Sequence, residues 1–456
     1  MNVAEKKSSG AVANGVSNSS HIEASEVQSV LRKHMLVDGF DMTLDMHKSQ
    51  GSYLYDAKHG KRYLDFFTFI ASNPLGMNHP KINNDDFKKK LGEVAVSKPS
   101  LSDIYLQDQA EFVDTFFKLA VPSYFKYSFF IEGGALAVEN ALKVAFDWKV
   151  KKNFAKGITE EKGHKIIHFK EAFHGRSGYT MSLTNTSPEK TALYPKFEWP
   201  RITNPYLTYP LTAESLAQTV ENEKIAIAEI HDALRKNKDD IAAIILEPIQ
   251  GEGGDHHFRK EFFEELRKIC DENEMLFILD EVQTGIALTG KWWAHQHYVQ
   301  PDIITFGKKM QVCGLLCTDR VDDVPNNVFH EPSRINSTWG GNITDMVRSK
   351  RILEIIHEDD LVKNSEVMGD YMLSKIQELY ENYYGLVLSP RGKGLMCAFS
   401  CKDTETRNAV VKKTLEAGVM VLPCGRRTIR FRPPVNINQS EINEGFDALN
   451  KALKSF

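Results

Sequence analysis

Apolar residues in the middle of the chain form short unbroken runs, and several of the stretches between them have apolar positions at helical spacing. Unbroken runs are typical of parallel strands buried on both faces. They predict strands at residues 127–131, 165–169, 241–246, 275–279 and 302–306. Residues 135–149 and 258–273 place apolar side chains on one stripe, which predicts helices. This alternation predicts an α/β fold with a mainly parallel sheet.

The pattern differs at the two ends of the chain. Residues 53–56 and 62–65 flank a loop that contains Gly60, which predicts a β-hairpin. A long charged region, residues 346–383, has helical spacing. It precedes predicted strands at residues 395–401, 419–422 and 428–431. This end of the chain is therefore expected to form a smaller α+β domain.

These patterns divide the chain into four parts. The N-terminal part is rich in small polar residues, which bury too little apolar surface to offset the entropy lost on ordering. We predict a disordered tail (1–25), an N-terminal segment that joins the small domain (26–80), a large domain (81–345) and a C-terminal small domain (346–456).

Composition and charge narrow the class of protein. The 456 residues are 42% hydrophobic and 26% charged with a net charge of −4, which excludes a wholly disordered or fibrous chain. That charge balance gives no electrostatic reason for a nucleic-acid or membrane partner. Residues 1–20 lack the apolar centre of a secretory signal, and six cysteines are too few for a disulfide framework. The sequence therefore predicts a cytoplasmic protein of enzyme size with reduced thiols.

Candidate chemistry lies just after the predicted strands, because ligands bind at strand carboxyl ends in open α/β sheets. Residues 133–135, two glycines and an alanine, open a helix, and the N–H groups at such a positive helix end suit a phosphate. Residues 173–176 include a phenylalanine, a histidine and an arginine, which could stack on and hydrogen-bond a flat charged ligand. Each segment taken alone also fits a turn without a ligand.

The next strand ends carry charged residues. Glu247 and Glu252 stand in a loop with three glycines. Asp280 directly ends an apolar run, and a buried carboxylate is costly without a cationic partner. Asp280 is therefore interpreted as an acid that holds a cationic nitrogen of a ligand. The alternatives are that it caps a helix or forms a salt bridge within the protein. Lys308 follows the last strand, where a lysine can have a lowered pKa and act as a nucleophile, the alternative being a surface lysine.

Two other patterns predict no site. Residues 285–291 match the first part of a P-loop, but Trp292 stands where a Ser or Thr hydroxyl should hold magnesium. The cysteine pairs 313/317 and 397/401 lack a second spaced pair, and zinc needs four converging ligands, or three and a water. We therefore predict neither nucleotide hydrolysis nor a metal site.

Taken together in chain order, these segments resemble the class III aminotransferases, which are pyridoxal 5′-phosphate (PLP) enzymes of fold type I. The resemblance covers about residues 30–456. It rests on residues 133–135, 173–176, 247–248, 280–285, 301–302, Lys308, 337–342 and 430–434. It implies PLP as the cofactor and a large domain, with a mainly parallel sheet, beside a smaller α+β domain.

The resemblance also implies roles for single residues. Lys308 would bind PLP covalently, Asp280 would pair with the pyridinium nitrogen, and Phe173 would stack on the ring. Gln283 would hydrogen-bond near the ring hydroxyl. Thr338 would reach the phosphate of a neighbouring subunit, which implies an obligate homodimer with shared sites. The expected catalytic residues are Lys308, Asp280 and Phe173. The expected cofactor-binding residues are Gly134, Ala135, Phe173, His174, Glu247, Asp280, Val282, Gln283, Lys308 and Thr338.

Two departures from the usual family pattern indicate a branch. Residues 133–135 lack a side-chain hydroxyl for the phosphate, and residues 307–314 lack the glycine-rich run after the lysine. Together with residues 250–255 and 336–342, these segments are similar to the L-lysine 6-aminotransferase branch. The implied reaction converts L-lysine and 2-oxoglutarate to 2-aminoadipate 6-semialdehyde and L-glutamate. An ornithine or 4-aminobutyrate aminotransferase is the alternative, and a PLP-binding protein without turnover is a more distant one.

Such a site must accept two substrate shapes. Arg176 is the candidate for the α-carboxylate of lysine, which lies far from the reacting ε-amine, and Arg430 for the glutamate carboxylate close to the ring. The resemblance places Glu252 to neutralise Arg430 for lysine and to swing aside for glutamate. The glycines that flank Glu252 are expected to give the backbone latitude for this movement. Asn336 completes the expected substrate-binding set.

Overall fold

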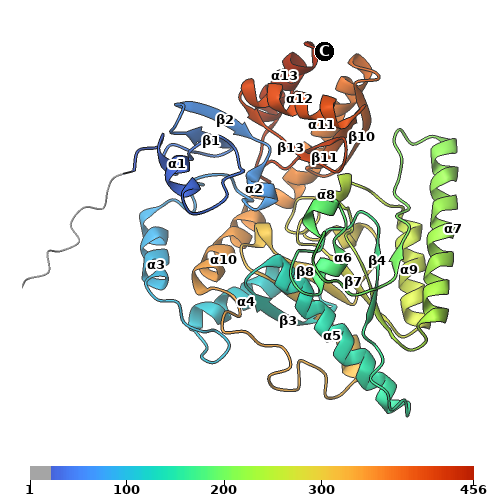
Figure 1. The fold of residues 1–456 in the computed structure, drawn as a ribbon. Helices are drawn as coiled ribbons and strands as arrows, with labels where there is room; N and C mark the ends of the chain where they lie inside the picture. The colour runs from blue at the N-terminus through green and yellow to red at the C-terminus, as the bar shows by residue number, and fades with distance from the viewer. Residues whose placement is uncertain (1–21) are drawn as a thin grey trace, which may run out of the picture.

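A seven-stranded sheet forms the centre of the protein (Figure 1). The computed structural model describes residues 22–456, so most of the predicted tail, residues 1–25, lies outside the described residues. The strands of this sheet are β3 (Phe125–Ile131), β4 (Lys165–Phe169), β5 (Arg201–Ile202), β6 (Ile241–Leu246), β7 (Leu276–Asp280), β8 (Ile303–Phe306) and β9 (Cys313–Thr318). Their spatial order is β3-β9-β8-β7-β6-β4-β5. Neighbours from β8 to β5 pair in parallel, and β9 is antiparallel to β3 and β8. The predicted mainly parallel sheet is confirmed.

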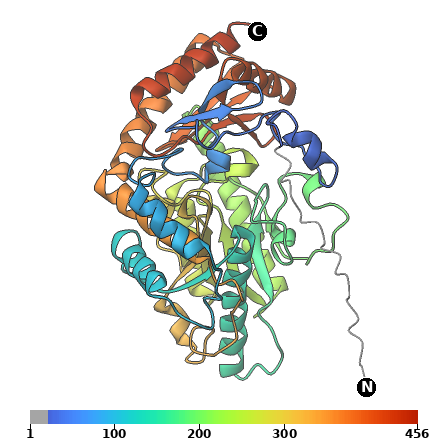
Figure 2. The same cartoon turned by 90° about the vertical axis from the view of Figure 1, so that its left-hand side faces the viewer.

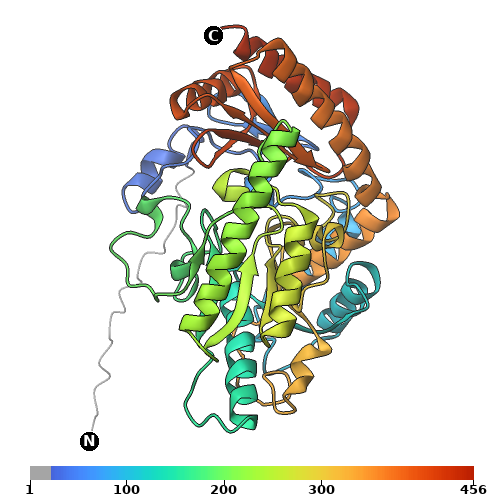
Figure 3. The same cartoon turned by 90° about the vertical axis from the view of Figure 1, so that its right-hand side faces the viewer.

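Helices cover both faces of this sheet, as its unbroken apolar strands require. Ile244 of β6 packs in one core cluster with residues of α7 (Ala213–Lys236) and α9 (Lys260–Glu272). Figure 3 shows these two helices side by side. Ile245, the next residue, packs in another cluster with α5 (Gly134–Ala155). Successive side chains of a strand point to opposite faces, so β4, β6, β7, β8 and β9 each contribute buried residues to both clusters.

A smaller unit is built from the two ends of the chain (Figures 1 and 2). Its antiparallel sheet has the order β10-β11-β14-β13. The bounds of these strands are β10 (Val387–Lys393), β11 (Met396–Cys401), β13 (Leu422–Cys424) and β14 (Thr428–Phe431). The predicted hairpin forms as β1 (Tyr53–Asp56) and β2 (Lys61–Asp65), and β2 pairs in parallel with β12 (Val419–Met420). The smaller α+β unit is therefore confirmed, whereas the division at residues 25, 80 and 345 stays a prediction.

Several helices complete the two units. The region predicted to be helical over residues 346–383 is two helices, separated near Asp360, whose φ is +50°. These are α10 (Ile343–Glu358), which packs against α3 and α4 of the large unit, and α11 (Leu361–Asn382), which packs against β10 and β11. The others are α1 (Val27–Arg32), α2 (Thr68–Ala71), α3 (Asp85–Ala95), α4 (Gln107–Leu119), α6 (Thr180–Leu183), α8 (Gly251–Gly254), α12 (Thr404–Glu416) and α13 (Gln439–Leu453). No helix within residues 22–456 has the length and apolar content needed to cross a bilayer.

Candidate active site

A cavity of about 450 Å³ lies at the carboxyl ends of the parallel strands. It brings together segments that follow β3, β4, β6, β7 and β8, as expected for an open α/β sheet. Eleven of the predicted residues line it: Gly134, Ala135, Phe173, His174, Arg176, Glu247, Glu252, Asp280, Val282, Gln283 and Lys308. The sequence analysis assigned no role to four others, which are Ser72, Gly175, Ile249 and Cys313. Cys313 begins β9, and Cys317 lies on the same strand.

The N-terminus of α5 forms one wall of the cavity. The helix begins at Gly134 and continues to Ala155, and both Gly134 and Ala135 line the cavity. The first N–H groups of a helix have no partner within the helix, and the helix dipole adds positive potential there. This wall is therefore suited to a phosphate, although its residues offer no side-chain hydroxyl.

Asp280, the last residue of β7, is held in one orientation by its neighbours. Its Oδ2 lies 2.8 Å from His174 Nδ1, and its Oδ1 accepts hydrogen bonds from Thr305 Oγ1 at 3.0 Å and Val282 N at 3.1 Å. The side chain is only 5% exposed. A buried, oriented carboxylate that faces a cavity is suited to pair with a cationic ring nitrogen.

Glu247, just after β6, joins two loops of the site. Its Oε1 accepts a hydrogen bond from Phe173 N at 2.9 Å, and its Oε2 accepts one from Gly251 N at 3.2 Å. Burial raises the pKa of Glu247 to about 7. Through these bonds one side chain sets the position of the phenylalanine and of the turn that carries Glu252.

Lys308 lies in the cavity, whereas the adjacent lysine does not line it. Lys308 follows β8 with a φ of +49°, an uncommon conformation for a residue with a side chain, and such strain occurs often at functional sites. Burial lowers its pKa to about 8, and the charges of Arg430 and Arg432 act in the same direction. Lys309 is buried elsewhere and donates from Nζ to the Gln283 carbonyl oxygen at 2.7 Å. The geometry therefore distinguishes the two lysines.

The lowered pKa of Lys308 predicts how its amine reacts in PLP-free protein. Only the neutral amine is nucleophilic, so its acylation rate should rise up to a pH of about 8 and then level. Exposed lysines, with a pKa of about 10.4, should gain reactivity well beyond that pH. Competitive labelling with acetic anhydride, followed by peptide mass spectrometry, measures both. A Lys308 profile that still rises at pH 10 would contradict the assigned environment.

Two arginines and two acids connect this cavity to the small unit. Arg430 NH2 donates to Glu252 Oε2 at 2.7 Å, and Arg432 NH2 pairs with Asp255 Oδ1 at 2.5 Å. Gln283, expected near the ring hydroxyl, uses its Oε1 to accept from Arg432 NH2 at 2.9 Å. The role predicted for Gln283 stays a prediction. Arg432 lies in the segment 430–434, which contributed to the family resemblance, but the sequence analysis assigned Arg432 no role in the site.

Close packing is one reason for the glycines at two positions beside Glu252. A Cβ on Gly253 would lie 2.3 Å from the Glu171 carbonyl oxygen, and one on Gly251 would lie 2.2 Å from Gln283 Oε1. These glycines allow close packing of the turn against its neighbours. The expectation that the flanking glycines give the backbone latitude for a movement of Glu252 stays a prediction.

Three of the predicted residues do not line this cavity. Arg430 is buried and bonds to Glu252, which does line it. Asn336 and Thr338 are exposed in the loop that precedes α10. Thr338 was expected to act on a neighbouring subunit, and its position outside the cavity of its own chain leaves that role a prediction. The substrate role of Asn336 is likewise a prediction.

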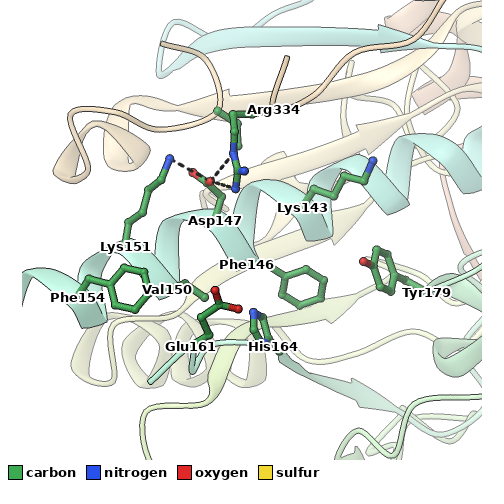
Figure 4. Close-up of a pocket in the computed structure, with 11 residues that line it drawn as sticks. Lys143, Phe146, Asp147, Val150, Lys151, Phe154, Glu161, His164, Tyr179 and Arg334 are labelled. Carbon is green, nitrogen blue, oxygen red and sulfur yellow. Dashed lines mark hydrogen bonds and ion pairs between the residues drawn. The ribbon is translucent and has the colours of Figure 1, made fainter. Parts of the chain in front are cut away.

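A second cavity, of about 370 Å³, lies beside α5 away from its N-terminus (Figure 4). In its wall Asp147 pairs with Lys151 at 3.0 Å and with Arg334 at 2.5 Å. None of the predicted site residues lines it. Within residues 22–456, moreover, no cluster of three or more His, Cys, Asp or Glu side chains could hold a metal. The cavity at the strand ends is therefore the candidate active site.

The donor set at the strand ends fits PLP. Helix N–H groups face a phosphate position, Asp280 offers a carboxylate for the ring nitrogen, and Lys308 offers an amine of lowered pKa for the aldehyde. Phe173 offers a ring that could stack on the cofactor, and it also lines the cavity.

Comparison with known proteins agrees with this chemistry. Residues 36–453 match the family Aminotransferase class-III. An L-lysine-epsilon aminotransferase of Mycobacterium tuberculosis is 50% identical over 94% of this chain and 95% of that protein. The human mitochondrial 4-aminobutyrate aminotransferase is 31% identical over 85% of this chain and 80% of that protein. A solved structure of lysine aminotransferase from M. tuberculosis superposes with a TM-score of 0.93 at 49% identity, covering 95% of this chain and 99% of the other. The chain therefore belongs to the class III aminotransferases, fold type I enzymes whose cofactor is pyridoxal 5′-phosphate.

Proposed function

We propose that this enzyme is an L-lysine 6-aminotransferase, which transfers the ε-amino group of L-lysine to 2-oxoglutarate. The products are 2-aminoadipate 6-semialdehyde and L-glutamate. The observation that carries the proposal is the ion pair between Glu252, which lines the cavity, and the buried Arg430 behind it, whose charge Glu252 neutralises. The 50% identity to a protein named L-lysine-epsilon aminotransferase, against 31% to a 4-aminobutyrate aminotransferase, supports it.

The residues of the cavity divide the chemistry among them. When bound, PLP supplies an electron sink for the electron pair that is left when the reacting carbon loses its proton. Lys308 Nζ takes that proton and returns it, as general base and then general acid. Asp280 keeps the ring nitrogen charged, and Glu247 holds the backbone of Phe173 in place. Two half-reactions at one cavity imply ping-pong kinetics.

The two arginines suit the two substrate shapes. Arg176 is exposed at the mouth of the cavity and can hold the distant α-carboxylate of lysine, while the neutralised Arg430 leaves the inner end free of unpaired charge. When 2-oxoglutarate or glutamate binds, its carboxylate next to the reacting carbon displaces Glu252 from Arg430. The second carboxylate then reaches Arg176.

We also propose that the enzyme works as a homodimer in the cytoplasm. Thr338 and Asn336 lie exposed in one loop, where a second copy could bring its cavity against them. Trp339 lies in the same loop, and 38% of its surface is exposed. Such exposure of a large apolar side chain is expected where a second protomer covers it in the dimer.

A comparison of amine donors tests the proposed reaction. We expect L-lysine to convert the visible spectrum of the holoenzyme to that of the aminated cofactor, with kcat/KM at least about tenfold above L-ornithine and 4-aminobutyrate. L-Ornithine is one methylene shorter than lysine, and a pocket fitted to the longer substrate discriminates against the loss of one methylene by roughly 10–200-fold. Spectral titration and measurement of the glutamate formed with 2-oxoglutarate provide the data.

Two outcomes would contradict this reading. Equal or faster reaction with ornithine or 4-aminobutyrate would favour the alternative donor. A spectrum unchanged by every amine, with no glutamate produced, would indicate a PLP-binding protein without turnover.

A further inference from the structure

Glu252 has a second cationic partner, which the reaction as described does not use. Lys190 Nζ lies 2.5 Å from Glu252 Oε1, while Arg430 NH2 lies 2.7 Å from the other oxygen, Oε2. Each carboxylate oxygen therefore has its own cation. The three side chains come from three separate segments, the loop after α6, the turn α8 and strand β14, so the arrangement is tertiary and not local.

Lys190 stands where the active-site cavity meets the outside. It lines a neighbouring cavity of about 720 Å³, and Arg176 lines both that cavity and the active-site cavity. Its Nζ is 5.4 Å from the ring centre of Phe173, and its side chain is 26% exposed. Arg430, in contrast, is 3% exposed, so the carboxylate of Glu252 joins an outer cation to an inner one.

The charges of this cluster match one of the two substrates. Arg430, Glu252 and Lys190 together carry one excess positive charge. A carboxylate that arrives at Arg430 completes two neutral pairs, provided that Glu252 stays with Lys190. Without Lys190, the same arrival would leave Glu252 as an unpaired carboxylate in a largely buried site, which is costly. Although burial acts to raise the pKa of Glu252, Arg430 and Lys190 outweigh it and hold that pKa below its usual range.

We propose that Lys190 is a positioning residue that retains Glu252 when the acceptor's carboxylate takes Arg430, and so favours the 2-oxoglutarate half-reaction. The inference rests on the proposed function and adds to it. Glu252 would turn about Oε1, which keeps its bond to Lys190, while Oε2 leaves Arg430. The tight packing of the flanking glycines agrees with a movement confined to this side chain.

The test compares the two half-reactions in single turnovers of the holoenzyme. Lys190→Met removes the charge, and Lys190→Arg keeps it. Lys196→Met is the matched control, because Lys196 lies on the same loop and its Nζ donates to the backbone oxygens of Thr191 and Tyr194. Lys190→Met is also combined with Glu252→Ala. The probes are L-lysine with the PLP form and 2-oxoglutarate with the aminated form.

We expect Lys190→Met to lower kcat/KM for 2-oxoglutarate at least about tenfold, mainly through KM, and to leave the L-lysine half-reaction within about twofold of the wild type. Lys190→Arg should restore the 2-oxoglutarate half-reaction, and Lys196→Met should change neither. In the Glu252→Ala background, Lys190→Met should have no further effect, because the carboxylate that it retains is gone.

Other results would overturn the inference. Equal losses in both half-reactions would indicate a structural role for Lys190, and a selective loss with L-lysine would indicate that it holds the donor's carboxylate. No loss in either, or an undiminished effect in the Glu252→Ala background, would show that it does not act through Glu252. Failure of the proposed function is a separate result, since wild-type enzyme would then not react with L-lysine.

Discussion

Replacement of Lys308 by alanine is expected to lower the turnover of amino transfer by at least about 10⁴-fold. Lys308 is the lysine that lines the cavity, and its amine, with a pKa lowered to about 8, is the base positioned to move the proton. Among residues 22–456, Lys308 alone of the lysines lines that cavity. Turnover is measured with saturating PLP, so that a lower affinity for the cofactor is not mistaken for a slower chemical step.

The adjacent lysine provides the control. Lys309 is buried and donates to the Gln283 carbonyl oxygen, so Lys309→Met removes an amine without removing the one in the cavity. Borohydride reduction of the holoenzyme followed by peptide mapping should locate the cofactor on Lys308 in the wild type and in Lys309→Met. Label on another residue, or none, would refute the assignment on which the proposed function depends.

Replacement of Asp280 by asparagine is expected to lower kcat by about 10³-fold, since removing one partner of a buried charge pair costs roughly 4 kcal/mol. Asparagine keeps the shape and can still accept from Thr305 and Val282, but it cannot balance a positive ring nitrogen. The cofactor should therefore bind more weakly and withdraw electrons less strongly. Turnover and cofactor release on dialysis measure the two effects.

Asp302 offers a matched control for this substitution. It is also a buried aspartate, but it precedes β8 at the opposite end of the sheet, where it pairs with Arg267 at 2.8 Å. Asp302→Asn should lower thermal stability and leave kcat per folded molecule near that of the wild type. Equal losses of kcat in the two variants would mean that Asp280 acts through the fold and not through the cofactor.

The strands and the residues at their ends could be predicted because both signals are local. An unbroken apolar run such as 241–246 suits a strand covered on two faces, and a polar residue that directly ends such a run must lie at the sheet edge. β9 was missed. Glycine and two cysteines interrupt its apolar run, although Leu315 and Leu316 pack into opposite clusters. A strand of this composition is recognisable only from its neighbours β3 and β8.

The amino-acid sequence thus determined the α/β class and which residues stand at the strand ends, since hydrophobic spacing and strand ends are properties of short segments. Only the tertiary structure decided which charges meet there. Glu252 pairs with Lys190, 62 residues away, and with Arg430, 178 residues away. Nothing in the spacing along the chain encodes such partners, because the distance between two side chains depends on how the sheet and the small unit pack together. The same packing brings Gly251 and Gly253, on either side of Glu252, into close contact with Gln283 and Glu171.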